Sequence, residues 1–305
     1  MMNRSLAVIS SPFQLFCLNE FIKQKEIVNV KVLLLYNKQS YKAYQEALDL
    51  FEIKGVKMIL RKRFITRLQL LLFIVLGRKF KYLIIGNFMD NHQRLFLKRK
   101  TFDKSYILDD GTESIVKFKN KYLDELAARS KSPFELFTMF EVAKNFKYPI
   151  TINELLFFKK EIETKHTNDE IYIIGQPLGE LNIISKNQYG IFIENILKIN
   201  MGSKIKYFPH RLENTNHLKE KFKTYDVEIF NMKSFFEIFL IKNKYLPKKI
   251  IGFYSTALIS AAYSLPKSNK LEIEYHYLKE FNSNEYVRKV MDYFINIPSL
   301  KGQFY

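Results

Sequence analysis

The feature of this sequence that most constrains its fold is a regular alternation of short apolar runs with segments of helical periodicity. Such an alternation predicts a mostly parallel sheet covered by helices on both faces. In the first half of the chain the apolar runs are SLAVIS (5–10), VKVLLLY (30–36), VKMILR (56–61), KYLIIG (81–86) and SYILDD (105–110). The chain is therefore expected to be an α/β protein.

The second half repeats this rhythm after a polar interruption. The segment KKEIETKHTNDE (159–170) has little apolar periodicity, so we place a domain boundary there and expect domains at 1–160 and 161–305. The 305 residues, 47% of them apolar, can supply two cores. We expect two Rossmann-like domains facing each other across a cleft, with strands after the boundary at IYIIGQP (171–177), IKYFP (205–209), VEIFN (227–231) and KIIGFYS (249–255).

The balance of charge indicates an anionic partner. The chain has 49 Lys and Arg against 31 Asp and Glu, a net charge of +18. Nucleic acid, a phospholipid surface and a charged small substrate all fit this balance, and charge alone does not choose among them.

Several features predict a cytoplasmic protein without a transmembrane helix. The single cysteine, Cys17, excludes an internal disulfide and a cysteine-based zinc cluster, and we interpret it as a small buried apolar residue. The opening MMNRSLAVISSPFQL lacks the layout of a signal peptide. The longest apolar stretch, LQLLLFIVLG (68–77), is about half as long as a bilayer span.

That apolar stretch is bordered by basic residues, namely RKR (61–63), Arg67 and RKFK (78–81). A helix of this kind can lie on an anionic membrane surface, and it can equally be a core helix with solvated ends. The sequence leaves both readings open.

Polar residues follow several of the expected strands, and the first group is in YILDDGTESI (106–115). Asp109 and Asp110 end an apolar run, and Gly111 permits a sharp turn. The group is either a turn or a site at which a carboxylate acts as general base. Adjacent aspartates on a strand point to opposite faces, so the pair is poorly arranged to chelate one metal ion.

A second group follows the run in KIKYFPHRLE (204–213). His210 and Arg211 are placed to bind and neutralise a phosphate, and a capping or surface histidine is the alternative.

Two further groups lie in the last third of the chain. Glu237, in the apolar run SFFEIFL (234–240), is either solvent-facing on a helix or an acceptor for the hydroxyls of a ribose. Ser255 and Thr256 lead from KIIGFYS into a helix of small residues. They are either helix caps or part of a phosphate site at the helix N-terminus.

The order of these groups forms a pattern: Asp-Asp-Gly, a histidine at a strand end, a glutamate and a Ser-Thr pair. This pattern resembles that of bacterial sialyltransferases of the GT-B fold. The likeness is closest to the lipooligosaccharide and capsule sialyltransferases. It extends from SSPFQL (10–15) to the Ser-Thr pair at 255–256.

The resemblance implies roles for these residues with CMP-sialic acid as the donor. Asp109 would be the general base on the acceptor hydroxyl, with Asp110 and Gly111 beside it in the substrate site. His210 would hydrogen-bond the CMP phosphate and assist its departure, with Arg211 next to it. Glu237 would hold the ribose, and Ser255 with Thr256 would bind the phosphate. The family's histidine motif is His-Pro, whereas here Pro209 precedes His210, which puts the local backbone shape and the role of Arg211 in question.

The chemistry of this donor agrees with the composition. A basic cleft would concentrate a substrate that carries a phosphodiester and a carboxylate. A donor with a single phosphate removes the usual need for a metal, so we expect an inverting transferase without cofactor or metal. Its acceptor would be a galactose-ended or sialylated glycan of lipooligosaccharide or capsule, lipid-linked, reached at the inner membrane face. A transferase for another CMP-activated sugar is one alternative.

A basic nucleic-acid-binding protein without catalysis is an alternative of another class. Against it, the basic residues are dispersed, no nucleic-acid-binding motif is found and Trp is absent, so we expect no nucleic-acid partner. The linkage, and whether the chain forms a homodimer, are left open.

Overall fold

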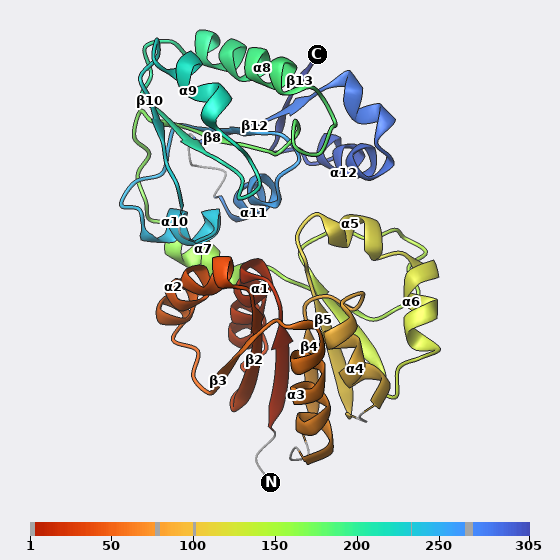
Figure 1. Cartoon of the computed structure of the whole chain (residues 1–305). Coiled ribbons are helices and arrows are strands. Elements are labelled where there is room, and N and C mark those ends of the chain that lie inside the picture. The colour runs from red at the N-terminus through yellow and green to blue at the C-terminus, as the bar shows by residue number, and fades with distance from the viewer. Residues whose placement is uncertain (1–3, 77–79, 100–101, 233, 266–270) are drawn as a thin grey trace. The chain divides into compact units, whose positions relative to one another are not determined.

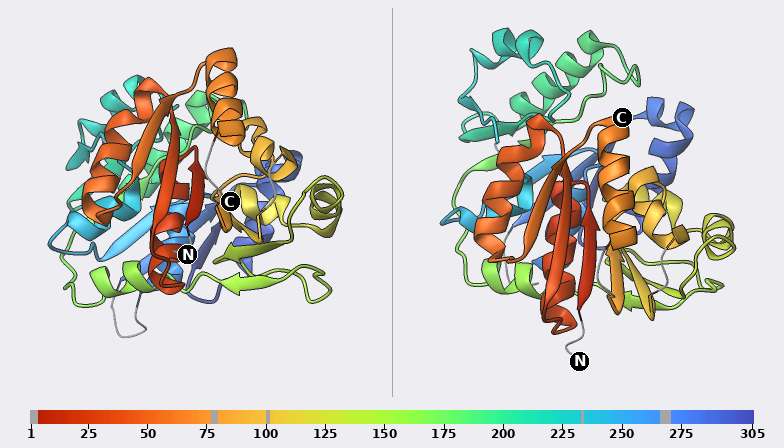
Figure 2. Two further views of the ribbon diagram at one scale, coloured as in Figure 1. Left: turned by 90° about the horizontal axis from the view of Figure 1, so that it is seen from below. Right: turned by 60° about the horizontal axis from the view of Figure 1, so that its bottom comes forward.

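The computed structural model describes residues 4–76, 80–99, 102–232, 234–265 and 271–305 (Figures 1 and 2). The chain divides into two compact α/β units. The first comprises the chain up to Phe158 together with Ser234 and Phe235, and the second comprises the rest. The division falls within helix α7 (Leu156–Ile162).

The first unit is built on a seven-stranded sheet in the order β3-β2-β1-β4-β5-β6-β7, with every neighbouring pair parallel. This confirms the parallel sheet predicted from the apolar runs, and the last two strands were not expected. The strands are β1 (Ser5–Ile9), β2 (Val30–Tyr36), β3 (Val56–Leu60), β4 (Tyr82–Ile85), β5 (Lys104–Leu108), β6 (Phe134–Thr138) and β7 (Ile150–Ile152).

Helices cover both faces of this sheet (Figures 1 and 2). Helix α1 begins at Pro12, because the Ser11 side chain caps it and Pro12 occupies its first turn. The other helices are α2 (Tyr41–Phe51), α3 (Arg63–Leu76), α4 (Asn91–Arg99), α5 (Glu113–Lys117) and α6 (Asn120–Ala127), with α1 spanning Pro12–Gln24. Strand β1 lies between β2 and β4, so the strand order reverses there, and in such sheets ligands bind beyond the carboxyl ends of the strands at this switch point.

The second unit repeats the same plan with six parallel strands in the order β10-β9-β8-β11-β12-β13. Its switch point therefore lies between β8 and β11. The strands are β8 (Ile171–Ile174), β9 (Ile205–Phe208), β10 (Val227–Ile229), β11 (Lys249–Gly252), β12 (Glu272–Tyr277) and β13 (Lys301–Phe304). The helices are α8 (Lys186–Ile199), α9 (Asn216–Phe222), α10 (Phe236–Lys242), α11 (Thr256–Ser264) and α12 (Glu285–Ile295).

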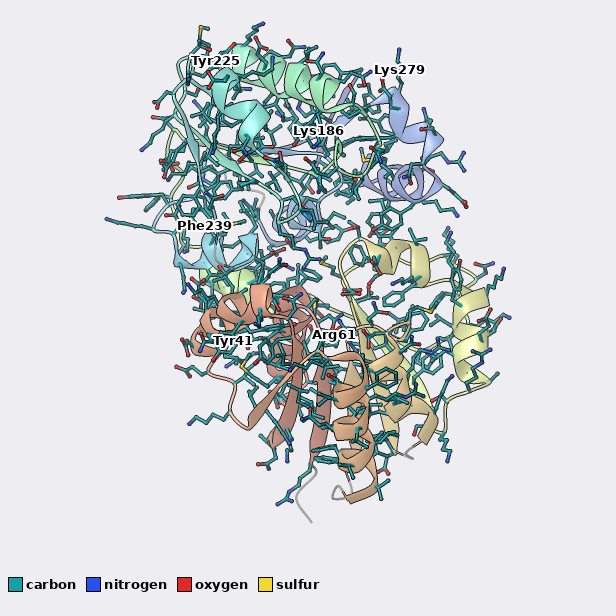
Figure 3. All side chains as sticks on the ribbon, viewed as in Figure 1. Tyr41, Arg61, Lys186, Tyr225, Phe239 and Lys279 are labelled. Carbon is teal, nitrogen blue, oxygen red and sulfur yellow. The ribbon has the colours of Figure 1, made fainter. Side chains whose placement is uncertain are left out.

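Each unit has its own apolar core. In the first, aliphatic side chains of the central strands pack against Leu70 of α3, Phe96 of α4 and Leu123 of α6. In the second, Phe239, labelled in Figure 3, packs against Phe208 of β9 and Phe230 beyond β10. Cys17 is buried, as predicted. Within the described ranges, no helix has the length and apolar character needed to cross a membrane.

Candidate active site

The Asp-Asp-Gly segment lies directly beyond the carboxyl end of β5. Gly111 adopts a φ of +70°, a backbone conformation that residues other than glycine rarely adopt. The chain turns sharply there and enters α5. The segment therefore lies at the carboxyl-end edge of the sheet. Strand β5 neighbours β4, so Asp109, Asp110 and Gly111 are one strand away from the switch point between β1 and β4.

Asp109 is directed toward β6 and is completely buried. Thr138 Oγ1 donates a hydrogen bond to its Oδ1 over 2.6 Å, and the backbone N–H of Met139 donates to its Oδ2 over 2.8 Å. Burial raises the pKa of Asp109 to about 7, and these hydrogen bonds oppose the rise. A carboxyl group with this pKa exchanges its proton readily near neutral pH.

Asp110 is directed the other way, toward β1 and β4. Gln14 Nε2 donates to its Oδ1 over 2.6 Å and Ser11 Oγ lies 3.4 Å from the same oxygen, while Asn87 Nδ2 donates to its Oδ2. Burial raises the pKa of Asp110, and the hydrogen bond from Gln14 opposes the rise. The two carboxylates therefore face different strands, as alternation along a strand predicts.

The partners of Asp110 belong to an amide network that was not predicted from the sequence. Gln14 Oε1 accepts hydrogen bonds from the backbone N–H of Ser10 and from Gln93 Nε2. Gln93 Oε1 accepts from the backbone N–H groups of Gly86 and Asn87, both over 2.8 Å. Gly86 leaves the space that Gln14 fills, because a Cβ there would lie 2.2 Å from Gln14 Cδ. The sequence signal available for this network was a set of polar residues after β1 and β4, with Gln14 and Gln93 in the first turns of α1 and α4.

His210 follows Pro209 at the carboxyl end of β9. The backbone N–H of Leu212 donates to His210 Nδ1 over 3.2 Å, which leaves Nε2 to carry the ring proton. Burial lowers the pKa of His210 to about 4, and the charge of the exposed Arg211 contributes to the same shift. The ring is therefore neutral at pH 7 in the absence of an anion, with Nε2–H as a donor.

A buried cluster positions the backbone of His210. Glu213 accepts a hydrogen bond from the His210 N–H over 3.0 Å and another from the Tyr207 hydroxyl, which lies 2.8 Å from that of Tyr189. Burial raises the pKa of Glu213 to about 7. Gly175, at the end of β8, makes room for the cluster, because a Cβ there would lie 2.3 Å from Glu213 Oε2. No pattern in the sequence predicted this cluster.

Glu237 lies near the start of α10 and is 3% exposed. Of the two alternatives, the solvent-facing side chain is therefore wrong, since Glu237 is buried together with its neighbours Phe236 and Ile238. Ser260 Oγ of α11 donates to Glu237 Oε1 over 2.7 Å, and burial raises the pKa of the carboxyl. Glu237 thus connects α10 to α11.

Ser255 is the N-cap of α11, and its hydroxyl accepts a hydrogen bond from the backbone N–H of Ala257 over 3.3 Å. Ser255 therefore caps the helix, and Thr256 is the first residue of the helix. Because the strands of this sheet are parallel, Gly175, His210 and Ser255 follow β8, β9 and β11 at one edge. Asp109 and Asp110 belong to the other unit. The described residues contain no group of three or more His, Cys, Asp or Glu side chains that could hold a metal ion.

Comparison with known proteins identifies the family of the chain. The model of the alpha-2,8-polysialyltransferase (POLYST) family matches residues 56–270 of the chain. No curated protein matches the sequence.

Among solved structures, the chain is similar to S. aureus MnaA with UDP, at a TM-score of 0.56 and 12% identity over 90% of this chain and 79% of that one. It is also similar to the Methanocaldococcus jannaschii UDP-GlcNAc 2-epimerase in complex with UDP-GlcNAc and UDP (TM-score 0.54, 11% identity, 99% and 89% of the two chains). A third likeness is to Arabidopsis thaliana UGT89C1 complexed with UDP (TM-score 0.50, 9% identity, 99% and 86%). These likenesses confirm the expected GT-B fold class.

Proposed function

The chain belongs to the alpha-2,8-polysialyltransferase family, and from this premise we propose that it transfers sialic acid from CMP-sialic acid to the 8-hydroxyl of a sialic acid at the end of a glycan. The family match decides between the glycosyltransferase and the nucleic-acid-binding alternative in favour of the enzyme. Of the acceptors expected from the sequence, an α-2,8 bond selects the sialylated one, because it joins two sialic acids. We place that acceptor on a lipid-linked lipooligosaccharide or capsule glycan.

The observation that carries the proposal is the buried carboxyl of Asp109, whose pKa of about 7 suits a general base. In this mechanism Asp109 takes the proton of the acceptor hydroxyl as its oxygen attacks the anomeric carbon of the donor. The bond from that carbon to the phosphate oxygen breaks with its electron pair, CMP leaves, and the configuration inverts in one displacement. Thr138 and the Met139 N–H hold the carboxylate in place.

Residues of the second unit are assigned to the departing CMP. The Nε2–H of His210 donates to the phosphate oxygen on which charge develops. Arg211 adds a positive charge, and Ser255, Thr256 and the first amides of α11 bind the phosphate. Glu237 accepts from the ribose through Oε2, while Oε1 keeps its bond to Ser260. A donor with one phosphate needs no bridging metal, so we propose that the reaction is metal-independent.

The test is incubation of the purified chain with CMP-sialic acid and two matched acceptors, one ending in galactose and one in sialic acid. We expect CMP release and stepwise mass increments of one sialic acid only with the sialylated acceptor, and an NMR signature of substitution at O8. Transfer to the galactose-ended acceptor alone would overturn the acceptor assignment. Transfer from other nucleotide sugars in preference to CMP-sialic acid would overturn the donor assignment.

A further inference from the structure

Helix α3 presents an apolar stripe to solvent. Five of its large apolar side chains are half or more exposed, a larger number than any other element carries within the described parts of the chain. They are Phe64 (82%), Ile65 (53%), Leu68 (60%), Leu72 (50%) and Val75 (76%). At 3.6 residues per turn these positions fall within about 100° of the helix circumference. They therefore form one continuous stripe, which we call the α3 stripe.

The opposite side of α3 holds the helix to the sheet. Leu70 is fully buried, and Phe73 packs on Phe80 and Phe96. Thr66, also buried, accepts a hydrogen bond from the Lys62 N–H and donates to the Leu60 carbonyl. The α3 stripe is thus not needed for packing of the first unit, and a surface of this kind on a folded domain marks an interaction site.

The stretch of sequence that contains α3 is strongly basic. Between Ile53 and Met89 the chain has nine of its 49 Lys and Arg and none of its 31 Asp and Glu, so this stretch carries +9, half of the net charge of +18. Lys62 and Arg67 are exposed, and Arg61, labelled in Figure 3, forms an ion pair with Asp90. Residues 77–79, which include two of the basic residues next to the helix, lie outside the described part of the chain.

We propose that α3 binds in the plane of an anionic phospholipid membrane, with the α3 stripe among the acyl chains and the basic residues at the headgroups. An in-plane membrane helix combines an apolar face containing Phe and Leu with Lys and Arg beside it. A second copy of the chain would bring two strongly positive surfaces together, and nucleic acid would match the charge but leave the apolar side chains in water. Only the lipid surface satisfies both features. The inference does not depend on which donor or acceptor the enzyme uses.

The absence of Trp from the chain allows a direct test. The variant Phe64→Trp places a single fluorophore in the α3 stripe, and Ile199→Trp places one at the end of α8, where the side chain is 72% exposed. With vesicles of phosphatidylglycerol and phosphatidylcholine we expect a blue shift for Phe64→Trp, quenching by brominated acyl chains, and weakening of the binding by salt. Ile199→Trp should show none of these. Equal shifts for the two variants, or equal binding to pure phosphatidylcholine vesicles, would overturn the proposal.

Two double variants distinguish binding through the α3 stripe from binding that depends only on net charge. Phe64→Glu/Val75→Glu and Ile199→Glu/Met201→Glu change the net charge equally at side chains that are all at least 72% exposed. We expect the first pair to weaken vesicle binding by at least about thirtyfold and the second to weaken it by less than about threefold, with unchanged thermal melting for both. Vesicle binding unaffected by the first pair would refute the proposal. A dimer in light scattering that only the first pair dissociates, without vesicle binding, would assign the stripe to a second copy instead.

Discussion

Replacing Asp109 by Asn should separate catalysis from stability. Asp109 is completely buried, and its partners are the side chains of Thr138 and Ser114 and the backbone N–H of Met139. An amide fits the Thr138 and Met139 contacts, because its oxygen can accept from the Met139 N–H while its NH₂ donates to Thr138 Oγ1. We therefore expect Asp109→Asn to fold, and to lose the general base.

The magnitudes follow from the raised pKa. In the unfolded chain Asp109 would ionise at 3.8, whereas in the folded protein it ionises at about 7. Between these two pH values the folded state keeps a proton on Asp109 that the unfolded chain has lost. The contribution of Asp109 to the free energy of unfolding therefore falls as pH rises from about 4 to 7, by up to about 4 kcal/mol. The Asn variant does not titrate, so it does not lose this stability. Its stability relative to the wild type should therefore increase as pH rises from about 4 to 7. Wild-type kcat/KM should fall about tenfold per pH unit below 7.

The assay is CMP release at saturating acceptor together with thermal melting at pH 5 and pH 8. We expect Asp109→Asn to lower turnover by at least about a hundredfold, the usual effect of losing a general base, and to melt no lower than the wild type at pH 8.

Asp110→Asn is the matched control. Its partners include the NH₂ groups of Gln14 and Asn87, and Gln93 fixes the orientation of the Gln14 amide. The NH₂ group of an asparagine at position 110 would face the NH₂ group of Gln14 or Asn87, and two donors cannot form a hydrogen bond. We therefore expect Asp110→Asn to be less stable than Asp109→Asn but to keep more of its turnover. If Asp110→Asn is instead stable and the more damaging to turnover, the assignment of the base within the pair is wrong.

Four further outcomes are expected. His210→Ala should depress turnover by at least about tenfold more than it weakens CMP binding in calorimetry, because charge on the phosphate develops in the transition state; unchanged turnover would remove His210 from the active site. Arg211→Ala should weaken CMP binding and flatten its salt dependence, and a steep salt dependence in that variant would place the guanidinium elsewhere. Activity should persist in excess EDTA, whereas a loss restored by magnesium or manganese would contradict the metal-independent mechanism. Gly175→Ala should lower the melting temperature by the equivalent of about 1–3 kcal/mol, because its Cβ would meet Glu213 Oε2 and Tyr207 Oη at 2.3 and 2.5 Å; an unchanged melt would show that the cluster can shift.

Local patterns in the sequence were enough to predict strands β1–β5 and β8–β11 and where they end, but not β6, β7, β12 or β13. Apolar runs and caps such as Ser11 depend on neighbours within a few residues, and each predicted strand is present in the structure. Parallel strands also bring their carboxyl ends to one edge, so Asp109 and His210 could be placed at strand ends before their surroundings were known.

Tertiary structure decided what each of these side chains contacts. Gln14 reaches Asp110 across 96 residues of sequence, because the strand order places β1 close to β5. Glu237 is buried against Ser260, although an isolated carboxylate in an apolar helix is more often solvent-facing. For α3 the sequence allowed both a core helix and a surface helix, and only packing showed that Leu70 and Phe73 face the sheet while Phe64 and Val75 face water. Whether a side chain is buried depends on residues that are distant in the chain. The periodicity of one helix contains no information about those residues.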